Sequence, residues 1–228
     1  MAQKKGPAFD SRAALLEAAT VVVGEVGFDR LTVDAVTARA RLSKGTFFHF
    51  FASKEALLEA VCSGLTAQAW AQLHPLLGPP GAPAERLARY LAAARGFRLE
   101  RAGAVMALGA ALAREENDGL RRRLEAARRK LVRVPLAALL AEGNETGDFA
   151  VADAEVTADL LLEWGDAAGE GTLRMLRDGG SPEMATRRVN AALEATERVL
   201  GARTGALGRL APETLVPVAL AAREWSKS

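Results

Sequence analysis

The 228-residue sequence contains one cysteine, two histidines and one tyrosine. Because Cys62 is the only cysteine, no disulfide can form within the chain, which is typical of proteins in a reducing cytoplasm. Neither His49 nor His74 lies in a cluster of Cys, Asp or Glu with metal-ligand spacing. We therefore expect neither a bound metal nor another cofactor.

Long apolar runs and catalytic motifs are also missing. The longest uncharged apolar stretch, residues 102–113, is too short to span a bilayer, and the first ten residues do not resemble a signal peptide. The sequence has no Gly-rich, Walker or HExxH motif, and no base stands near Cys62 to activate it. These absences favour a cytoplasmic protein with no membrane partner and no enzymatic activity.

The residues that are abundant favour helices. Half of the residues are apolar and a quarter are charged, while β-branched and aromatic residues are sparse, so the sequence predicts an all-α fold. A Gly- and Pro-rich break at 78–83 separates an N-terminal domain, residues 8–68, from a C-terminal domain, residues 84–202. We expect a turn at 143–148 and only a short, poorly fixed helix in the tail, residues 203–228. The helices are expected at residues 11–26, 32–40, 43–51, from 53 onward, 84–97, 100–115, 119–141, 154–178 and 182–202.

Two short capped helices within residues 32–51 predict a helix-turn-helix. Thr32 and Ser43 are suitable N-cap residues for them, and Ser53 for the helix that follows. The second short helix contains four phenylalanines. Three of them share one face and are expected in the core, whereas Phe48 lies on the opposite face. Residues 1–54 carry eight Lys or Arg against five Asp or Glu, which suits a nucleic-acid contact without proving one.

The segment "LTVDAVTARARLSKGTFFHFFASKEALLEAV", residues 31–61, resembles the signature of the TetR family of bacterial repressors. The resemblance extends over about residues 10–65. It implies a three-helix DNA-binding domain, a homodimer that grips a near-palindromic operator on double-stranded DNA, and a C-terminal pocket whose small-molecule effector releases the DNA. It also implies DNA contacts by Thr32, Arg41, Ser43, Lys44, Gly45, Thr46, Phe48, His49 and Lys54.

The sequence departs from the family pattern at three positions. Arg41 stands where a glycine is usual in the turn, so it is either strained in a left-handed conformation or placed in a different turn. Thr37 replaces a small alanine between the two helices. Phe48 replaces a tyrosine and lacks the hydroxyl that would bond a phosphate.

The C-terminal domain offers weaker signals. Residues 120–133 hold seven basic residues and one acidic residue, which form either a solvated face or a second contact with an anionic partner. In that helix we expect Leu120, Leu124, Ala127, Leu131 and Val134 to face inward and Pro135 to cause a kink. Aromatic and sulfur side chains that suit a ligand pocket, with ordinary core as the alternative for each, are Trp70, Tyr90, Phe97, Met106 and Trp164.

The last two long helices are candidates for the dimer interface. Residues 165–171 are mostly small, and the last helix has an apolar stripe that includes Val189 and Leu193. The same stripes could instead form core within one chain.

The resemblance to the TetR family predicts a ligand-responsive, dimeric transcriptional repressor. Two alternatives remain open, a ligand-independent DNA-binding protein and a helical small-molecule-binding protein or enzyme without operator recognition.

Overall fold

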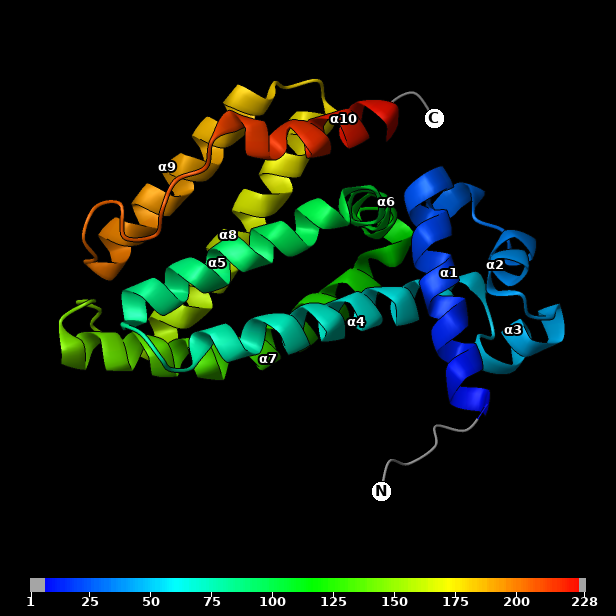
Figure 1. Ribbon diagram of the computed structural model, residues 1–228, viewed down its shortest axis with the longest axis horizontal. Coiled ribbons are helices and arrows are strands. Elements are labelled where there is room, and N and C mark those ends of the chain that lie inside the picture. Colours follow the sequence, from blue (N-terminus) through cyan, green and yellow to red (C-terminus); the bar gives the residue numbers. More distant parts are fainter. Residues whose placement is uncertain (1–6, 226–228) are drawn as a thin grey trace. The chain divides into compact units, whose positions relative to one another are not determined.

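The computed structural model describes residues 7–225, which form helices joined by short connections and contain no strand (Figure 1). The predicted all-α fold class is confirmed. The elements are α1 Pro7–Arg30, α2 Val33–Ala40, α3 Lys44–Phe50, α4 Lys54–Leu73, η1 His74–Leu77, α5 Pro83–Glu100, α6 Ala102–Leu112, η2 Glu115–Asn117, α7 Asp118–Thr146, α8 Ala154–Arg177, α9 Pro182–Leu200, η3 Pro212–Leu215 and α10 Val216–Trp225.

The described chain divides into two compact units that do not follow the expected domain boundaries. Unit 1 comprises residues 7–67 and 101–124, and unit 2 comprises residues 68–100 and 125–225. The N-terminal unit therefore includes α6 and the first turns of α7, which the sequence had suggested for the C-terminal domain. None of the described helices combines the length and apolarity needed to cross a membrane.

Close backbone packing explains why α6 groups with the N-terminal helices. A Cβ atom added at Gly103 would lie 3.0 Å from the carbonyl oxygen of Gly24, and one added at Gly24 would lie 3.3 Å from the amide nitrogen of Ala104. These two glycines let α1 and α6 touch directly. Ala107 and Leu108 of α6 are fully or nearly fully buried, which accounts for the apolar run at 102–113.

Leu120 is buried as expected, but the core of unit 2 corrects the inward face expected further along α7. Leu131 is 41% exposed and Val134 is 66% exposed, whereas Val132 and Leu136 are buried. Apolar residues recur at helical spacing on two faces of this helix, and the more strongly apolar face is the buried one. The core contains Leu77, Leu87, Val132, Leu136, Ala137, Leu139, Leu140, Phe149, Val151, Ala158, Leu162, Leu193, Leu200 and Leu207.

A further expectation about this unit, the turn at 143–148, is wrong over residues 143–146. Helix α7 continues through Pro135 as one helix and runs to Thr146, so residues 143–146 are helical rather than part of a turn. A Cβ at Gly143 would overlap the Phe149 ring at 2.0 Å, so the glycine lets the returning chain pack against the helix end.

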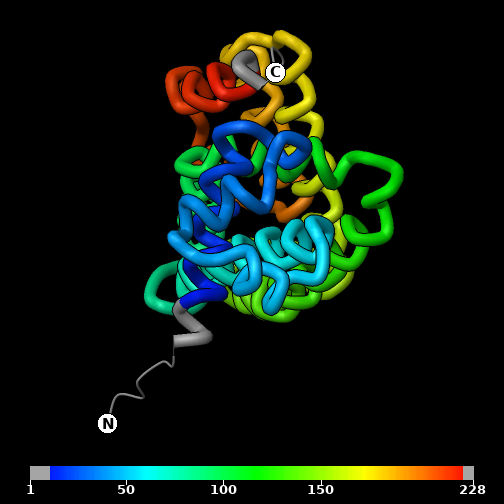
Figure 2. Tube along the Cα trace, turned by 90° about the vertical axis from the view of Figure 1, so that its right-hand side faces the viewer, coloured from blue at the N-terminus to red at the C-terminus, as the bar shows by residue number. Residues whose placement is uncertain are grey.

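The tail is also well fixed rather than loose. The buried carboxylate of Glu197 accepts hydrogen bonds from the amides of Gly205 and Leu207 and from the Arg209 guanidinium. The side chain of Asn190 exchanges two hydrogen bonds, of 2.8 and 3.0 Å, with the backbone of Leu210. Figures 1 and 2 both show α10, at the red end of the chain, beside α8. Polar side chains of α9 thus hold the tail in place.

Candidate functional site

Side-chain caps build the helix-turn-helix as the sequence predicts. The amide of Ala35 donates to Thr32 Oγ1 at 3.1 Å, and the amide of Thr46 donates to Ser43 Oγ at 3.0 Å. Ser53 caps α4 in the same way, through the amide of Ala56 at 3.2 Å. Each cap satisfies an amide that the first turn leaves unbonded, so the start of each helix is fixed by one hydroxyl.

The turn between α2 and α3 resolves two of the departures from the family pattern. Arg41 adopts the left-handed conformation, with φ 56° and ψ 41°, and its amide donates to the carbonyl of Ala38 at 3.2 Å. Within residues 7–225 it is the only non-glycine residue with positive φ. Buried Thr37 donates its hydroxyl to the Val33 carbonyl at 2.9 Å, so the extra oxygen is satisfied.

The phenylalanines of α3 divide as expected. Phe47 is 0% exposed and Phe51 is 2% exposed, whereas Phe48 is 57% exposed. Phe50 is half-buried. The Phe47 and Phe48 rings meet edge to face with centroids 5.3 Å apart, so the buried ring supports the exposed one. An apolar ring held rigidly at the surface suits contact with a partner.

The other candidate residues of α3 lie on this same exposed side. Ser43, Lys44, Gly45 and His49 are exposed, and Thr46 is half-buried. A Cβ at Gly45 would meet only Ser43 Oγ, at 3.6 Å, so nothing else crowds this side of the helix.

Exposed ion pairs and hydroxyls complete this surface. Lys44 Nζ lies 2.6 Å from Asp34 Oδ1, but both side chains are more than 60% exposed, so a phosphate can compete for the lysine. We call residues 43–46, Phe48 and His49 the α3 face.

Lys54 is held differently from the α3 face. Its ammonium donates to the Asp29 carbonyl at 2.9 Å and lies 4.8 Å from the centre of the Phe28 ring. The Lys54 ammonium therefore links the start of α4 to the end of α1, and its two other N–H groups can donate to further acceptors. Thr32 and Arg41 are exposed beside the α3 face on their own helix ends.

Three arginines of the basic segment at 120–133 pair with acidic residues of α8. Arg133 Nε lies 2.8 Å from Asp159 Oδ1, and its Nη2 lies 2.9 Å from Glu155 Oε2. Arg128 bonds Asp166, and Arg129 pairs with Glu163 at 3.4 Å.

Four acidic residues at helical spacing on α8 thus face the arginines of α7. These charges form a ladder between the two helices, which accounts for Arg128, Arg129 and Arg133 of the basic segment.

The five expected ligand liners differ in how deeply they are buried. Trp70 and Tyr90 are partly buried against the core of unit 2, and Phe97 is 8% exposed. Met106 is buried in α6 and belongs to unit 1. Trp164 is 41% exposed on α8, on a different side of the helix from buried Ala158 and Leu162.

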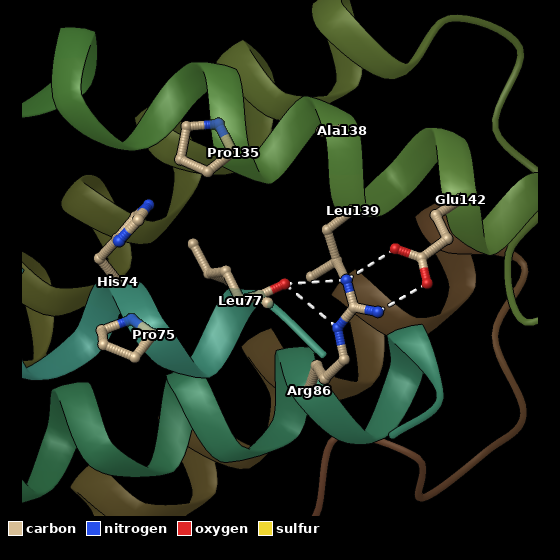
Figure 3. Close-up of a pocket in the computed structure, with 9 residues that line it drawn as sticks. His74, Pro75, Leu77, Arg86, Pro135, Ala138, Leu139 and Glu142 are labelled. Atoms are coloured by element: carbon tan, nitrogen blue, oxygen red, sulfur yellow. Dashed lines mark hydrogen bonds and ion pairs between the residues drawn. The ribbon is translucent and has the colours of Figure 1, made fainter. Parts of the chain in front are cut away.

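A pocket of about 290 Å³ lies between η1, the start of α5 and α7 (Figure 3). Arg86 forms one wall. Its guanidinium bonds both oxygens of Glu142, at 2.6 and 2.7 Å, and the carbonyl of Leu77. These hydrogen bonds lower the pKa of the Glu142 carboxyl. The other lining residues are His74, Pro75, Gly78, Pro135, Ala138 and Leu139.

The sequence reasoning missed Arg86 and Glu142. The sequence analysis had named Pro135, a third lining residue, only for the kink expected there. The basic wall of this pocket is fully engaged by protein acceptors, so the pocket presents mainly apolar surface.

The lone cysteine and the possible metal ligands can be placed in the residues described. Burial raises the pKa of the Cys62 thiol to about 12, so it stays protonated and unreactive at neutral pH. Among residues 7–225 no three His, Cys, Asp or Glu side chains are grouped so as to hold a metal ion.

The capped helix pair and its exposed second helix define the class, a helix-turn-helix DNA-binding protein. Residues 15–61 match the family model described as bacterial regulatory proteins, tetR family. The N-terminal domain of the chain belongs to this family, so the resemblance seen in the sequence is confirmed. The chain is a DNA-binding transcriptional regulator.

Solved structures share the fold over most of the chain. Salmonella enterica GusR matches with a TM-score of 0.64 and 21% identity, over 88% of this chain and 100% of that one. A putative TetR-family regulator from Rhodococcus sp. matches with a TM-score of 0.61 and 25% identity, over 84% and 99%. Bacillus subtilis FadR, solved in complex with stearoyl-CoA, matches with a TM-score of 0.64 and 17% identity, over 84% and 99%. No curated protein matches the sequence closely enough to count as a relative.

Proposed function

We propose that this protein is a homodimeric, ligand-responsive repressor that is released from a near-palindromic operator by a small molecule. The observation that carries the proposal is the α3 face, where Phe48 stays 57% exposed beside exposed Ser43 and Lys44 on a capped, rigid helix. In a helix-turn-helix the second helix enters the major groove, and hydroxyls and amides at its N-terminus suit phosphate oxygens.

Exposed apolar side chains support assembly through α8 and α9. Val156, Leu160 and Trp164 follow one another at four-residue spacing on α8 and are 53%, 57% and 41% exposed. On α9, which packs against α8, Met184 and Val199 are 45% and 46% exposed. Such a face is costly in water and is suited to a second copy of the chain, which would form a four-helix bundle.

This face differs from the stripe expected on α9. Leu193 is 6% exposed and Val189 packs with it in the core of unit 2. Charged replacements there would disrupt the subunit itself, so they would not report on the interface.

The chain connectivity supports coupling between a ligand and the operator. Helix α4 contributes residues 54–67 to unit 1 and 68–73 to unit 2, and α7 crosses between the units at residues 124–125. A ligand that favours one arrangement of unit 2 can act on unit 1 through these continuous helices. One structural relative, FadR, was solved with a bound acyl-CoA, which supports a ligand site in this chain too.

The proposal is tested by selecting DNA from a random pool with the purified protein. An enriched near-palindrome whose half-sites are about one helical turn apart is expected, with affinity that falls steeply with salt. Enrichment of asymmetric sequences, or of sequences that share only a DNA shape, would favour a ligand-independent architectural DNA-binding protein. A pool that yields no enriched sequence at modest salt would favour a helical binding protein or enzyme without operator recognition.

A further inference from the structure

Phe48 is the most exposed large apolar side chain in the part of unit 1 that the structure describes. It is 57% exposed, compared with 40% for Val21 and 36% for Val26, which both lie on α1. Phe48 instead lies on α3, the second helix of the helix-turn-helix. An exposed aromatic ring on a binding surface is suited to an apolar group of the partner.

The Phe48 ring is held in place by the core beneath it. It packs edge to face on the ring of Phe47, with centroids 5.3 Å apart and an angle of 83° between the ring planes. Phe47 is 0% exposed and its ring centroid lies 5.5 Å from that of Phe51, which is also buried. The Phe48 side chain therefore loses little freedom on binding, which lowers the entropic cost of a specific contact.

The ring does not suit the polar groups of DNA. Phenylalanine has no hydrogen-bond donor or acceptor, so covering a phosphate oxygen or a polar base edge with it would remove water without replacing the hydrogen bond. The groups of the α3 face that suit phosphates are the exposed hydroxyl of Ser43 and the exposed ammonium of Lys44. Phe48 thus requires an apolar counterpart on the DNA.

Gly45 leaves open space beside the ring. It precedes Phe48 by three residues, so the two positions are neighbours on the helix surface. A Cβ added at Gly45 would meet only Ser43 Oγ, at 3.6 Å. Helical side chains lean towards the N-terminus of their helix, and the first residues of a recognition helix are those that meet base edges. We therefore expect the ring to approach the bases rather than the sugars outside the groove.

The major groove offers one apolar group, the C5-methyl of thymine. The other groups that the bases present there are hydrogen-bond donors and acceptors. A ring that packs on the methyl group removes apolar surface of both molecules from water, and the neighbouring polar atoms keep their hydrogen bonds. The methyl group is thus the counterpart that fits the Phe48 ring.

We propose that Phe48 recognises the C5-methyl group of one thymine in each half-site of the operator. The contact gives the protein a preference for a T·A pair at one fixed position, which a contact with the phosphate backbone would not give. The inference rests on the operator binding proposed above, and it names the chemical group that one side chain of the α3 face contacts.

The test replaces the thymines of the selected operator by deoxyuridine, one at a time, and titrates each site with the full-length wild-type protein. Deoxyuridine pairs with adenine and keeps every polar atom of thymine, so only the methyl group is lost. Replacing the contacted thymine in one half-site should lower the affinity about fourfold, the value of one buried methyl group. Replacement in both half-sites should lower it more than about tenfold, and other thymines should change it less than about twofold.

Two variants show whether Phe48 is the side chain that makes this contact. Phe48→Ala should bind more weakly than the wild type and should no longer distinguish thymine from deoxyuridine, because no ring is left to cover the methyl group. Lys44→Ala is the matched control on the same helix. It should also weaken binding, through the loss of a phosphate contact, but should keep the full difference between thymine and deoxyuridine.

An operator that the wild type binds equally with and without the methyl groups refutes this inference alone, and that result does not depend on the folding of any variant. An equal loss at every thymine would overturn it too, as would a methyl effect that persists in Phe48→Ala or disappears in Lys44→Ala. Unfolding of Phe48→Ala would place the ring in the core and do the same. A pool without an enriched sequence refutes the proposed operator, and this inference with it.

Discussion

Phe47 and Phe48 are adjacent in the sequence but have opposite environments. The first is 0% exposed and the second is 57% exposed, although both rings belong to one seven-residue helix. The Phe47 ring therefore stabilises the domain, and we assign the Phe48 ring to contact with DNA. The helical period alone separated them, because Phe47, Phe50 and Phe51 share a face from which Phe48 is excluded.

Replacing each ring by alanine should separate stability from DNA binding. Phe47→Ala should lower the free energy of unfolding by about 3–5 kcal/mol, the usual range for emptying a buried phenylalanine site. Phe48→Ala should leave the thermal midpoint nearly unchanged and weaken operator binding. Melting curves and titrations against one operator measure both effects. If Phe48→Ala unfolds the domain as badly as Phe47→Ala, the exposed ring is part of the core.

Arg41→Gly tests the strain at the turn. Because Arg41 holds φ 56°, a glycine should raise the stability by up to about 1 kcal/mol, offset partly by its greater chain entropy. If the arginine also reaches a phosphate, the same variant should bind operator more weakly and lose about one unit of the salt slope. A variant that melts lower and binds with an unchanged slope would show that neither role belongs to this side chain.

At the scale of helices and segments, caps and breaks were predictable, whereas the buried face of α7 was not. Thr32, Ser43 and Ser53 mark helix starts by chemistry that acts over three residues, which a sequence displays directly.

The exposed stripe of α7 was mistaken for its core face because Leu131 and Val134 keep a proper helical spacing. Only the neighbours of a helix decide which of two apolar stripes is buried. The tail was underestimated for the same reason, since Glu197 bonds residues eight to twelve positions away, beyond the reach of local patterns.

The tail should come loose in acid. Hydrogen bonds from Arg209, Gly205 and Leu207 lower the pKa of Glu197 from 4.5 to about 2. The folded carboxyl thus holds its proton less tightly than the unfolded one, so its stabilisation is complete above pH 4.5 and disappears as the pH falls towards 2. The shift corresponds to about 3 kcal/mol.

Proteolysis within residues 203–211 should accelerate over this pH range in the wild type. Glu197→Gln should be cleaved quickly already at neutral pH, because the amide cannot pair with the Arg209 cation. Equal cleavage of the variant and the wild type at neutral pH would contradict the role assigned to Glu197.

The exposed face of α8 and α9 should hold two subunits together. Leu160→Glu places a charge on a side chain that is 57% exposed in the subunit, so helicity should be kept while the dimer dissociates. Val134→Glu is the matched control, since Val134 is equally apolar and 66% exposed but lies on α7. Sedimentation of both variants checks this. A Leu160→Glu variant that stays dimeric would place the interface elsewhere.

At the scale of the whole molecule, the function proposed depends on two units that share helices. Unit 1 presents the α3 face, and unit 2 contains the exposed apolar face of α8 and α9. The sequence predicted the class of protein because its DNA-binding signature is local. It could not show that α6 belongs with the N-terminal helices, because that depends on Gly24 meeting Gly103 across 79 positions of chain.

The central claim is that two copies of this chain place their α3 faces in adjacent major grooves. The most direct measurement compares the affinity for the selected operator with that for the same operator after about five base pairs are inserted at its centre, half a helical turn. The inserted site should bind no better than a single half-site, because the second recognition helix then faces the wrong side of the DNA. Equal affinity for both sites would show that the subunits bind independently and would contradict the account.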